Sequence, residues 1–195
     1  MEYRVMNIHE TGADQLQAWF SQADQACRER LSRFRRQEDR LRSLCADHLA
    51  REMLSAKLGR SPDELVFRRT EKGKPYLDGF PLHFNLSHSG DFVACAISEA
   101  PIGVDIEALR PIREELCKKV CGADELAYVY PDGKFHSERF LRLWTAKEAI
   151  LKQSGEGIAS DLRFPEVVHG EKISYPTLCL YQDATTQYII TIAYQ

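Results

Sequence analysis

Residues 101–110 read PIGVDIEALR, and the alternation over Gly103–Glu107 predicts a β-strand. Successive strand side chains point to opposite faces, so Asp105 and Glu107 share one face with Cα atoms roughly 6–7 Å apart. Two carboxylates that close repel each other unless a cation lies between them, and a hard cation such as Mg²⁺ prefers oxygen ligands of this kind. A pair of exposed charges at a strand end would fit the same residues.

A second stretch, residues 143–152, reads LWTAKEAILK and predicts a helix. Glu148 and Lys152 stand four residues apart and therefore share a helix face. An exposed ion pair would contribute only a few tenths of a kcal/mol and needs no function. The alternative makes Glu148 a third metal carboxylate or a general base, and Lys152 a phosphate ligand.

A third stretch, residues 83–98, reads HFNLSHSGDFVACAIS and predicts two strands joined at Ser87–Gly90. Hydroxyls, an imidazole and a glycine at such a turn suit contact with a phosphate, although His88 taken alone is more typical of a structural turn. A serine hydrolase is not expected, because Ser87 stands where G-x-S-x-G requires its first glycine. There is no Walker A loop, and Gly155–Gly157 does not continue into G-x-G-x-x-G.

Composition sets outer limits on the function. The 195 residues are 44% apolar and 28% charged, which suits one ample core or two small subdomains. No apolar run could span a bilayer and the N-terminus does not resemble a signal peptide, so we expect a cytoplasmic protein with no membrane partner. The six cysteines contain no C-x-x-C pair, and neither disulfides nor structural zinc are expected.

Residues 28–42 hold seven arginines and three acidic residues. A solvated helix face would explain this run, and a local anion site is the sharper interpretation. Nucleic acid is not an expected partner, because the whole chain carries a net charge of −3 and no series of aromatic residues accompanies the arginines.

Helices and antiparallel strands are expected in both halves, which indicates an α+β protein. Helices are expected from Thr11 or Asp14 to Phe20, over 36–58 and within 112–153, the last broken near Pro131. Strands are expected at the N-terminus and at Leu65–Arg68, Leu82–Leu86, Phe92–Ser98, Ile102–Ile106 and Tyr188–Ala193. The seam around Glu99–Pro101 divides the chain into subdomains 1–100 and 101–195.

Taken in order, these stretches resemble the 4′-phosphopantetheinyl transferase superfamily, of the Sfp type. The resemblance rests on EDRLRSLCADHLAR (38–51), GKPYL (73–77), FNLSHSG (84–90), GVDIE (103–107), WTAKEAILK (144–152) and SGEGI (154–158). It implies a holo-[acyl-carrier-protein] synthase type of enzyme. Such an enzyme transfers the phosphopantetheine arm of coenzyme A to a serine of an apo acyl or peptidyl carrier protein and releases adenosine 3′,5′-bisphosphate. The pathways would be fatty-acid, polyketide or nonribosomal peptide biosynthesis.

The resemblance also implies roles for individual residues. Asp105, Glu107 and Glu148 resemble ligands of Mg²⁺, or alternatively Mn²⁺. Glu148 is similar to the family's proton acceptor, and Lys152 to its pyrophosphate-binding lysine. The implied contacts with coenzyme A are Arg42 with Ser43 at its 3′-phosphate, Lys74 beside its adenine end, Lys152 on its pyrophosphate, and Arg30, Ser87 and His88. At Cys27 this chain has a cysteine where the family has another basic residue, a lysine.

Family precedent implies two similar α/β subdomains, a pseudo-dimeric fold with the active site in the cleft between them, and a monomer that needs no second chain. Residues 155–182 resemble the carrier-facing part of the family, where Ile158, Leu162 and Phe164 are apolar. Two other classes of function stay open: a binding protein that only recognises coenzyme A or a carrier, and a nucleic-acid binder centred on Arg28–Arg42.

Overall fold

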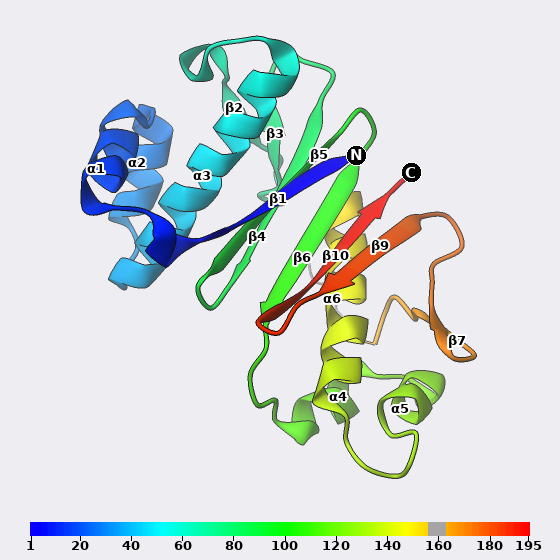
Figure 1. The fold of residues 1–195 in the computed structure, drawn as a ribbon. Coiled ribbons are helices and arrows are strands. Elements are labelled where there is room, and N and C mark those ends of the chain that lie inside the picture. The colour runs from blue at the N-terminus through cyan, green and yellow to red at the C-terminus, as the bar shows by residue number, and fades with distance from the viewer. Residues whose placement is uncertain (156–162) are drawn as a thin grey trace. The chain divides into compact units, whose positions relative to one another are not determined.

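The computed structural model describes residues 1–155 and 163–195, so Ile158 and Leu162 lie outside the described residues. The chain divides into two compact units, Met1–Glu99 and Ala100–Gln195. Each unit combines helices with antiparallel strands (Figure 1), which confirms the α+β class. Over the part of the chain that the structure describes, no helix is both long and apolar enough to cross a membrane.

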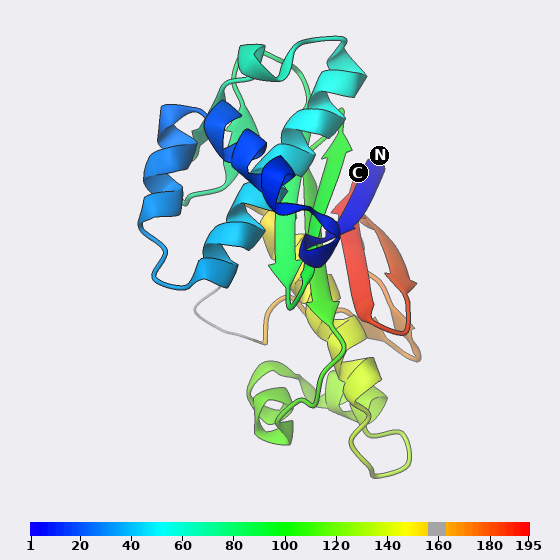
Figure 2. The ribbon, with the colours of Figure 1, turned by 60° about the vertical axis from the view of Figure 1, so that its left-hand side comes forward.

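The first unit is a three-stranded antiparallel sheet covered by a long helix. Its strands and helices are β1 (Glu2–Asn7), α1 (Ala13–Gln22), α2 (Gln25–Ser32), α3 (Gln37–Leu58), β2 (Phe67–Arg69), β3 (Pro75–Leu77), β4 (His83–Ser89) and β5 (Phe92–Ser98). The sheet order is β1-β5-β4, and β2 and β3 form a separate hairpin. Helix α3 packs on the sheet, and α1 and α2 pack on α3 (Figure 2).

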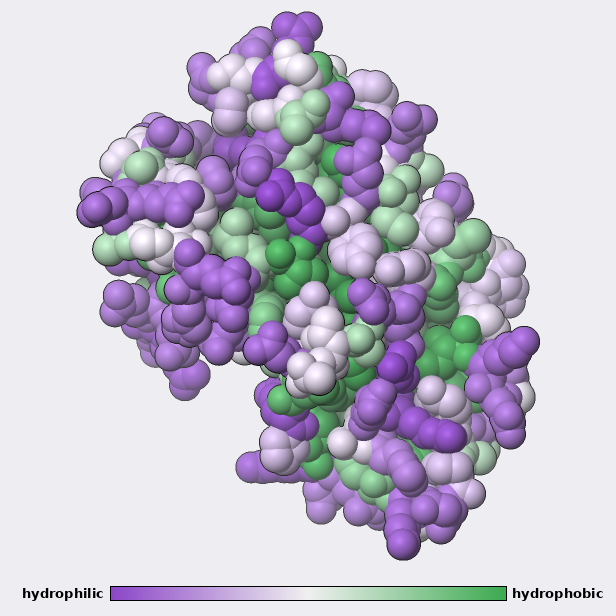
Figure 3. Space-filling view, in the orientation of Figure 1, coloured by the Kyte–Doolittle hydropathy of each residue, from purple (hydrophilic) through white to green (hydrophobic). Residues whose placement is uncertain are grey.

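Helix α3 supplies the largest share of the core of this unit. Leu44, Cys45, Leu49 and Met53 are buried at helical spacing against the sheet. The helix ends at Gly59, whose φ of 63° is the left-handed conformation that glycine adopts without steric cost. With apolar residues inside, hydrophilic side chains cover most of the visible surface over α1 and α2 (Figure 3).

The second unit repeats this design with different residues. Its elements are β6 (Ile102–Ala108), α4 (Glu114–Val120), α5 (Ala123–Val129), α6 (Ser137–Ser154), β7 (Val168–His169), β8 (Lys172–Ile173), β9 (Cys179–Ala184) and β10 (Tyr188–Tyr194). The sheet order is β6-β10-β9, and α6 packs on β6 and β10.

The two sheets share one connectivity. In each unit the first strand lies at an edge, a helix crosses the sheet, and a hairpin then supplies the other edge strand and the central strand. The chain has no internal sequence repeat that would reveal this. The likeness of the two subdomains, which family precedent implies, is visible in the topology.

Several boundaries differ from those expected. Strand β2 begins at Phe67, not Leu65, because Pro62–Glu64 form a 3₁₀ turn that Leu65 closes. The turn-forming segment KGKPYLDG contains β3, and β4 continues through Ser87 and His88 to Ser89. The edge strand β9 was not expected, because its half-exposed sequence CLYQDA lacks a continuous apolar face.

Gly103 lets α6 approach β6 at backbone distance. A Cβ on Gly103 would collide with the backbone oxygen of Ala149 and the backbone nitrogen of Gln153, and would lie 2.9 Å from the Cα of Gln153. These are backbone atoms of the helix, so no side chain can turn aside to make room. The position therefore requires glycine because of the close approach.

We expect Gly103→Ala to lower the free energy of unfolding by about 1–3 kcal/mol, since the helix must move outward to admit the methyl group. In a chain of this size that corresponds to a fall in Tm of about 2–4 °C per kcal/mol, measured by thermal melting. The control is Gly12→Ala, because nothing lies within 4 Å of a Cβ at Gly12. Gly12 is the N-cap of α1, and its replacement should lower the free energy of unfolding by less than about 1 kcal/mol, the usual effect of changing a helix cap. Equal melting temperatures for the two variants would contradict the packing argument.

Candidate functional site

Asp105 and Lys152 form an ion pair where β6 meets α6. The Asp105 Oδ1 and Lys152 Nζ atoms are 2.5 Å apart, and Asp105 is only 5% exposed. Because side chains alternate along a strand, Asp105 lies on the same face of β6 as Gly103, the face that contacts α6. The packing that requires glycine thus brings the last turns of α6 to this carboxylate.

Glu148 lies one helical turn before Lys152 and joins the same charge cluster. Burial raises the pKa of the Glu148 carboxyl above its ordinary value, and the Asp105 carboxylate raises it further. The charge of Lys152 lowers that pKa, and Glu107 adds a smaller upward effect. Three carboxylates and one ammonium group therefore act on one another here, where the two sequence stretches meet.

The carboxylates offer only oxygen donors, which suits a hard divalent cation. Among residues 1–155 and 163–195, no three His, Cys, Asp or Glu side chains lie close enough together to hold one ion jointly. Mg²⁺ needs only one or two protein carboxylates and completes its shell with water and phosphate oxygens. The donor set fits such a partly protein-held ion and does not form a closed protein cage.

Lys147 is a buried structural residue, although the sequence indicates only that it is a polar residue of the helix. It is 2% exposed and its Nζ lies 2.7 Å from Glu125, which is 1% exposed. The same Nζ donates to the backbone oxygens of Val120 and Arg163 at 3.0 and 2.6 Å. Glu125 in turn accepts from the backbone nitrogen of Val167. This network fixes α6 to the segments that flank it.

In the first unit, Arg42 connects α3 to the turn between β4 and β5. Its Nη1 donates to the backbone oxygen of Gly90 at 2.9 Å, and its Nη2 donates to Asp39 at 2.7 Å. The hydrogen bond from Arg42 lowers the pKa of the Asp39 carboxyl, and the charge of His88 contributes in the same direction. Arg42 and His88 thus both act on Asp39, and the neighbouring Ser87 is buried within β4.

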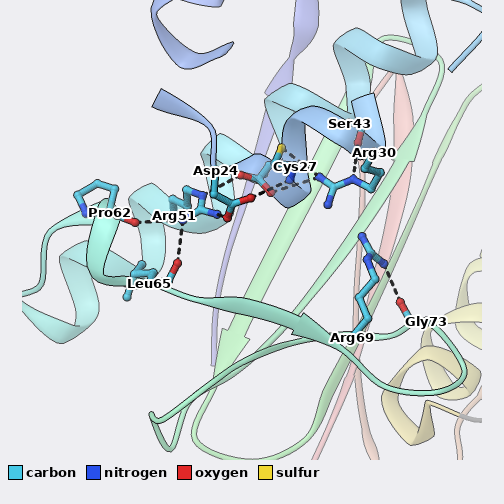
Figure 4. Close-up of polar contacts among 10 residues, drawn as sticks. Asp24, Cys27, Arg30, Ser43, Arg51, Pro62, Leu65, Arg69 and Gly73 are labelled. Carbon is cyan, nitrogen blue, oxygen red and sulfur yellow. Dashed lines mark hydrogen bonds and ion pairs between the residues drawn. The ribbon is translucent and has the colours of Figure 1, made fainter. Parts of the chain in front are cut away.

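A second group of predicted residues surrounds Asp47, an acid that sequence reasoning missed. Arg30 donates to Ser43 Oγ at 3.3 Å and to Asp47 Oδ1 at 3.2 Å, and Arg51 donates to Asp47 Oδ2 at 2.8 Å (Figure 4). Asp47 is 5% exposed, so it is a buried anion shared by two arginines. Its i,i+4 spacing to Arg51 was the available signal. Cys27 is buried nearby, and burial raises the pKa of its thiol to about 12.

Lys74 precedes β3 and is half-buried. Burial lowers the pKa of its ammonium group from 10.5 to about 8. The Thr70–Lys74 turn positions it: Thr70 donates its backbone N–H to the Lys74 oxygen at 2.9 Å, and the Lys74 backbone N–H donates to Thr70 Oγ1 at 3.1 Å. The residue is therefore a cation whose charge is easily lost.

We expect this shifted pKa to appear in the pH dependence of stability. The folded state loses the Lys74 proton near pH 8 and the unfolded state near 10.5, so the unfolded state binds more protons between these values. The free energy of unfolding of the wild type should therefore rise relative to that of Lys74→Met from about pH 8 to pH 10, by no more than about 1.4 kcal/mol per pH unit. Urea unfolding at pH 7.5 and 9.5 measures it. Lys72→Met, at an exposed lysine of the same turn, is the control, and an identical pH response of both variants would exclude the effect.

Comparison with known proteins covers both units. The family model described as "4′-phosphopantetheinyl transferase, N-terminal" matches residues 10–100, and the "4′-phosphopantetheinyl transferase superfamily" model matches residues 101–193. A 4′-phosphopantetheinyl transferase of Bacillus subtilis is 37% identical over 139 residues, which are 69% of this chain and 61% of the relative. The 4′-phosphopantetheinyl transferase Sfp of Bacillus subtilis strain 168 is 36% identical over 137 residues, with the same two shares.

A phosphopantetheinyl transferase of Thraustochytrium sp. is 30% identical over 203 residues, which cover 95% of this chain and 69% of the relative. The match with the Bacillus proteins spans about three fifths of their length. Sequence similarity therefore extends through both units and includes the three stretches that form the charge clusters. The chain belongs to the 4′-phosphopantetheinyl transferase superfamily.

Proposed function

We propose that this chain transfers the phosphopantetheine arm of coenzyme A to a serine of an apo acyl or peptidyl carrier protein. The observation that carries the proposal is the cluster of Asp105, Glu107, Glu148 and Lys152 where α6 packs on β6. Membership of the superfamily supports the same reaction. The products are the phosphopantetheinylated serine and adenosine 3′,5′-bisphosphate.

Asp105, Glu107 and Glu148 are proposed to supply the protein ligands of Mg²⁺, or of Mn²⁺ in its place, with one or two of the three carboxylates bound to the ion at a time. The ion would neutralise the charge of the coenzyme's pyrophosphate and so favour displacement at phosphorus. Lys152 would bind a pyrophosphate oxygen. Its flexible ammonium group, which is paired with Asp105 in the structure, suits a point contact with phosphate.

Glu148 is proposed to accept the proton of the carrier serine. Its carboxylate lies in the same charge cluster as Asp105 and Lys152, and a carboxylate within reach of the nucleophile can act as a general base. As the serine Oγ forms its bond to the phosphorus that bears the pantetheine arm, the bond from that phosphorus to the leaving bisphosphate breaks. The proton moves to the Glu148 carboxylate, so charge and atoms balance. No nucleophile of this chain is required.

The first unit is proposed to bind the nucleotide end of coenzyme A. Arg30 with Ser43, and Arg42 with His88, form two basic positions in this unit, and Lys74 adds a third cation. Ser87, on β4 beside His88, is a further proposed contact. The proposal includes a monomer, because every proposed site residue comes from one chain. It also includes a location in the cytoplasm. Phe164 of the carrier-facing segment is 53% exposed and is available for contact with a carrier protein.

Incubation with coenzyme A, Mg²⁺ and a panel of apo carrier proteins should add one phosphopantetheine arm to at least one carrier, read as a gain in intact mass. EDTA should abolish the gain. Asp105→Asn should lower the transfer rate at least about a hundredfold, because the metal loses a ligand. The matched control, Asp124→Asn, removes an exposed carboxylate of the same unit and should retain wild-type activity. Binding of coenzyme A without transfer to any carrier would favour a binding protein instead.

Glu148→Gln keeps the side-chain volume and removes the charge, so we expect a fall in the transfer rate of about 10²–10⁴-fold. The rate should be measured at saturating coenzyme A over pH 6–9, with Glu115→Gln, at an exposed helix position, as the control. A variant with half or more of the wild-type rate would exclude both roles proposed for Glu148.

A further inference from the structure

Two of the six cysteines lie side by side at the end of α4. The Sγ atoms of Cys117 and Cys121 are 3.5 Å apart, and the two residues are 0% and 3% exposed. Both are free thiols in the structure. The last turn of α4 holds them together, because the backbone nitrogen of Cys121 donates to the backbone oxygen of Cys117 at 3.0 Å. The proposed transfer reaction makes no use of this pair.

A disulfide between these two residues needs only a small movement. Bonded sulfur atoms lie about 2.05 Å apart, so the two Sγ atoms have to approach each other by about 1.5 Å. Residues four apart in a helical turn have Cα atoms roughly 6 Å apart, and disulfides join Cα atoms about 4.4–6.8 Å apart. Cys121 has extended backbone, with φ −102° and ψ 137°, so α4 ends there and no later turn of it has to move.

The two thiols differ in acidity. The hydrogen bond with Cys121 lowers the pKa of the Cys117 thiol, burial and the Glu114 carboxylate oppose this effect, and Tyr130 lowers that pKa further. The pKa of the Cys121 thiol is raised, first by its hydrogen bond with Cys117 and then by burial. Burial likewise raises the pKa of the Cys45 thiol, to about 11. Cys117 is therefore the more readily ionised thiol of the pair, and the thiolate is the form of cysteine that reacts with oxidants.

The residues on either side of Cys121 connect the pair to α6. The backbone oxygen of Val120 accepts from Lys147 Nζ at 3.0 Å, and the backbone nitrogen of Gly122 donates to Glu125 at 2.9 Å. Lys147 and Glu125 form the buried ion pair that fixes α6, the helix that carries half of the charge cluster. A movement of the last turn of α4 therefore displaces the groups that hold α6 in place.

We propose that Cys117 and Cys121 form a reversible modification site, at which a hydroperoxide converts the two thiols to an intrachain disulfide and thereby slows the transfer reaction. With hydrogen peroxide, the Cys117 thiolate attacks one oxygen, the O–O bond breaks and hydroxide leaves, which gives a sulfenic acid. The Cys121 sulfur then attacks the sulfenic sulfur, the S–O bond breaks and a second hydroxide leaves. The two thiol protons complete two water molecules, and the two electrons lost by the cysteines reduce the peroxide.

The oxidant reaches the buried sulfurs when α4 opens locally. The helix has seven residues, and helices of this length are only marginally stable without their packing. Segments of this kind open at a lower free energy than the core of a protein does. In a reducing compartment the two free thiols are the resting state, and a disulfide formed there is transient.

The test treats the full chain with hydrogen peroxide in slight molar excess and blocks the remaining thiols with iodoacetamide in denaturant. The intact mass before blocking should fall by about 2 Da, the mass of two hydrogen atoms, and two thiols should be lost to alkylation. Trypsin cuts after Lys118 and Lys119, so the disulfide should join two separate peptides, one with Cys117 and one with Cys121. Transfer to a carrier should slow at least about fivefold, the lower range of coupling between two sites, and dithiothreitol should restore it.

Three variants separate the two sulfurs from the other thiols. Cys121→Ala should form no cross-linked peptide and should instead accumulate a sulfenic acid at Cys117, which dimedone traps. Cys117→Ala should give neither product. Cys45→Ala is the matched control, because Cys45 is also 0% exposed but lies on α3 of the other unit, and it should respond to peroxide as the wild type does. A cooperative thermal transition of the oxidised wild type should show that the slower protein is still folded.

Two results would overturn the proposal. One is peroxide treatment that leaves the thiols of Cys117 and Cys121 available to iodoacetamide while other cysteines are oxidised. The other is complete cross-linking with an unchanged transfer rate, which would disconnect the pair from α6. The effect on the rate rests on the proposed function, whereas the cross-link is measured without coenzyme A or a carrier. Absence of transfer by the reduced protein would therefore contradict the proposed function, and the peptide map would still decide whether the disulfide forms.

Discussion

The contact between the backbone of α6 and Gly103 sets the positions of the acidic cluster. The helix backbone at Ala149 and Gln153 lies directly over Gly103. Asp105 is the next residue of β6 on the same face, so Glu148 and Lys152 lie beside it. A helix held one methyl group further out would separate Lys152 Nζ from Asp105 Oδ1, which are 2.5 Å apart. The electrostatics of the cluster therefore follow from a steric constraint. The buried Lys147–Glu125 pair holds the other side of the same helix, so α6 is fixed on two faces.

Both units hold their functional charges with buried groups of opposite sign. In the second unit the cation of Lys152 offsets carboxylates that would otherwise repel one another. In the first unit the buried carboxylate of Asp47 orients Arg30 and Arg51 and lies near Arg69. Such groups are costly to bury alone and stable when they are paired and hydrogen-bonded. Their arrangement leaves each cluster with an excess of one charge, negative around Asp105 and positive around Arg30.

The sequence predicted the features that depend on local pattern. The alternation around Asp105 predicted β6 with both carboxylates on one face, and the spacing of Glu148 and Lys152 placed them together on α6. The long helix that became α3 was expected within one residue of its observed start. The role of Glu125 could not be predicted, because it depends on Val167, which is distant in sequence. The spacing of Asp47 and Arg51 indicates only part of the role of Asp47, because its other partner, Arg30, lies on a different helix. The edge strand β9 was missed because it lacks a continuous apolar face.

The common connectivity of the two sheets separates architecture from chemistry. An edge strand, a crossing helix and a hairpin require only a pattern of apolar residues, which many sequences satisfy. The fold does not require particular residues at the polar positions of this framework. Guanidinium groups cluster in the first unit, and carboxylates cluster in the second. Two copies of one design can thus diverge until no repeat is visible in the amino-acid sequence. The likeness of the two units is found by comparing strand order and register, because the amino-acid sequence shows no repeat.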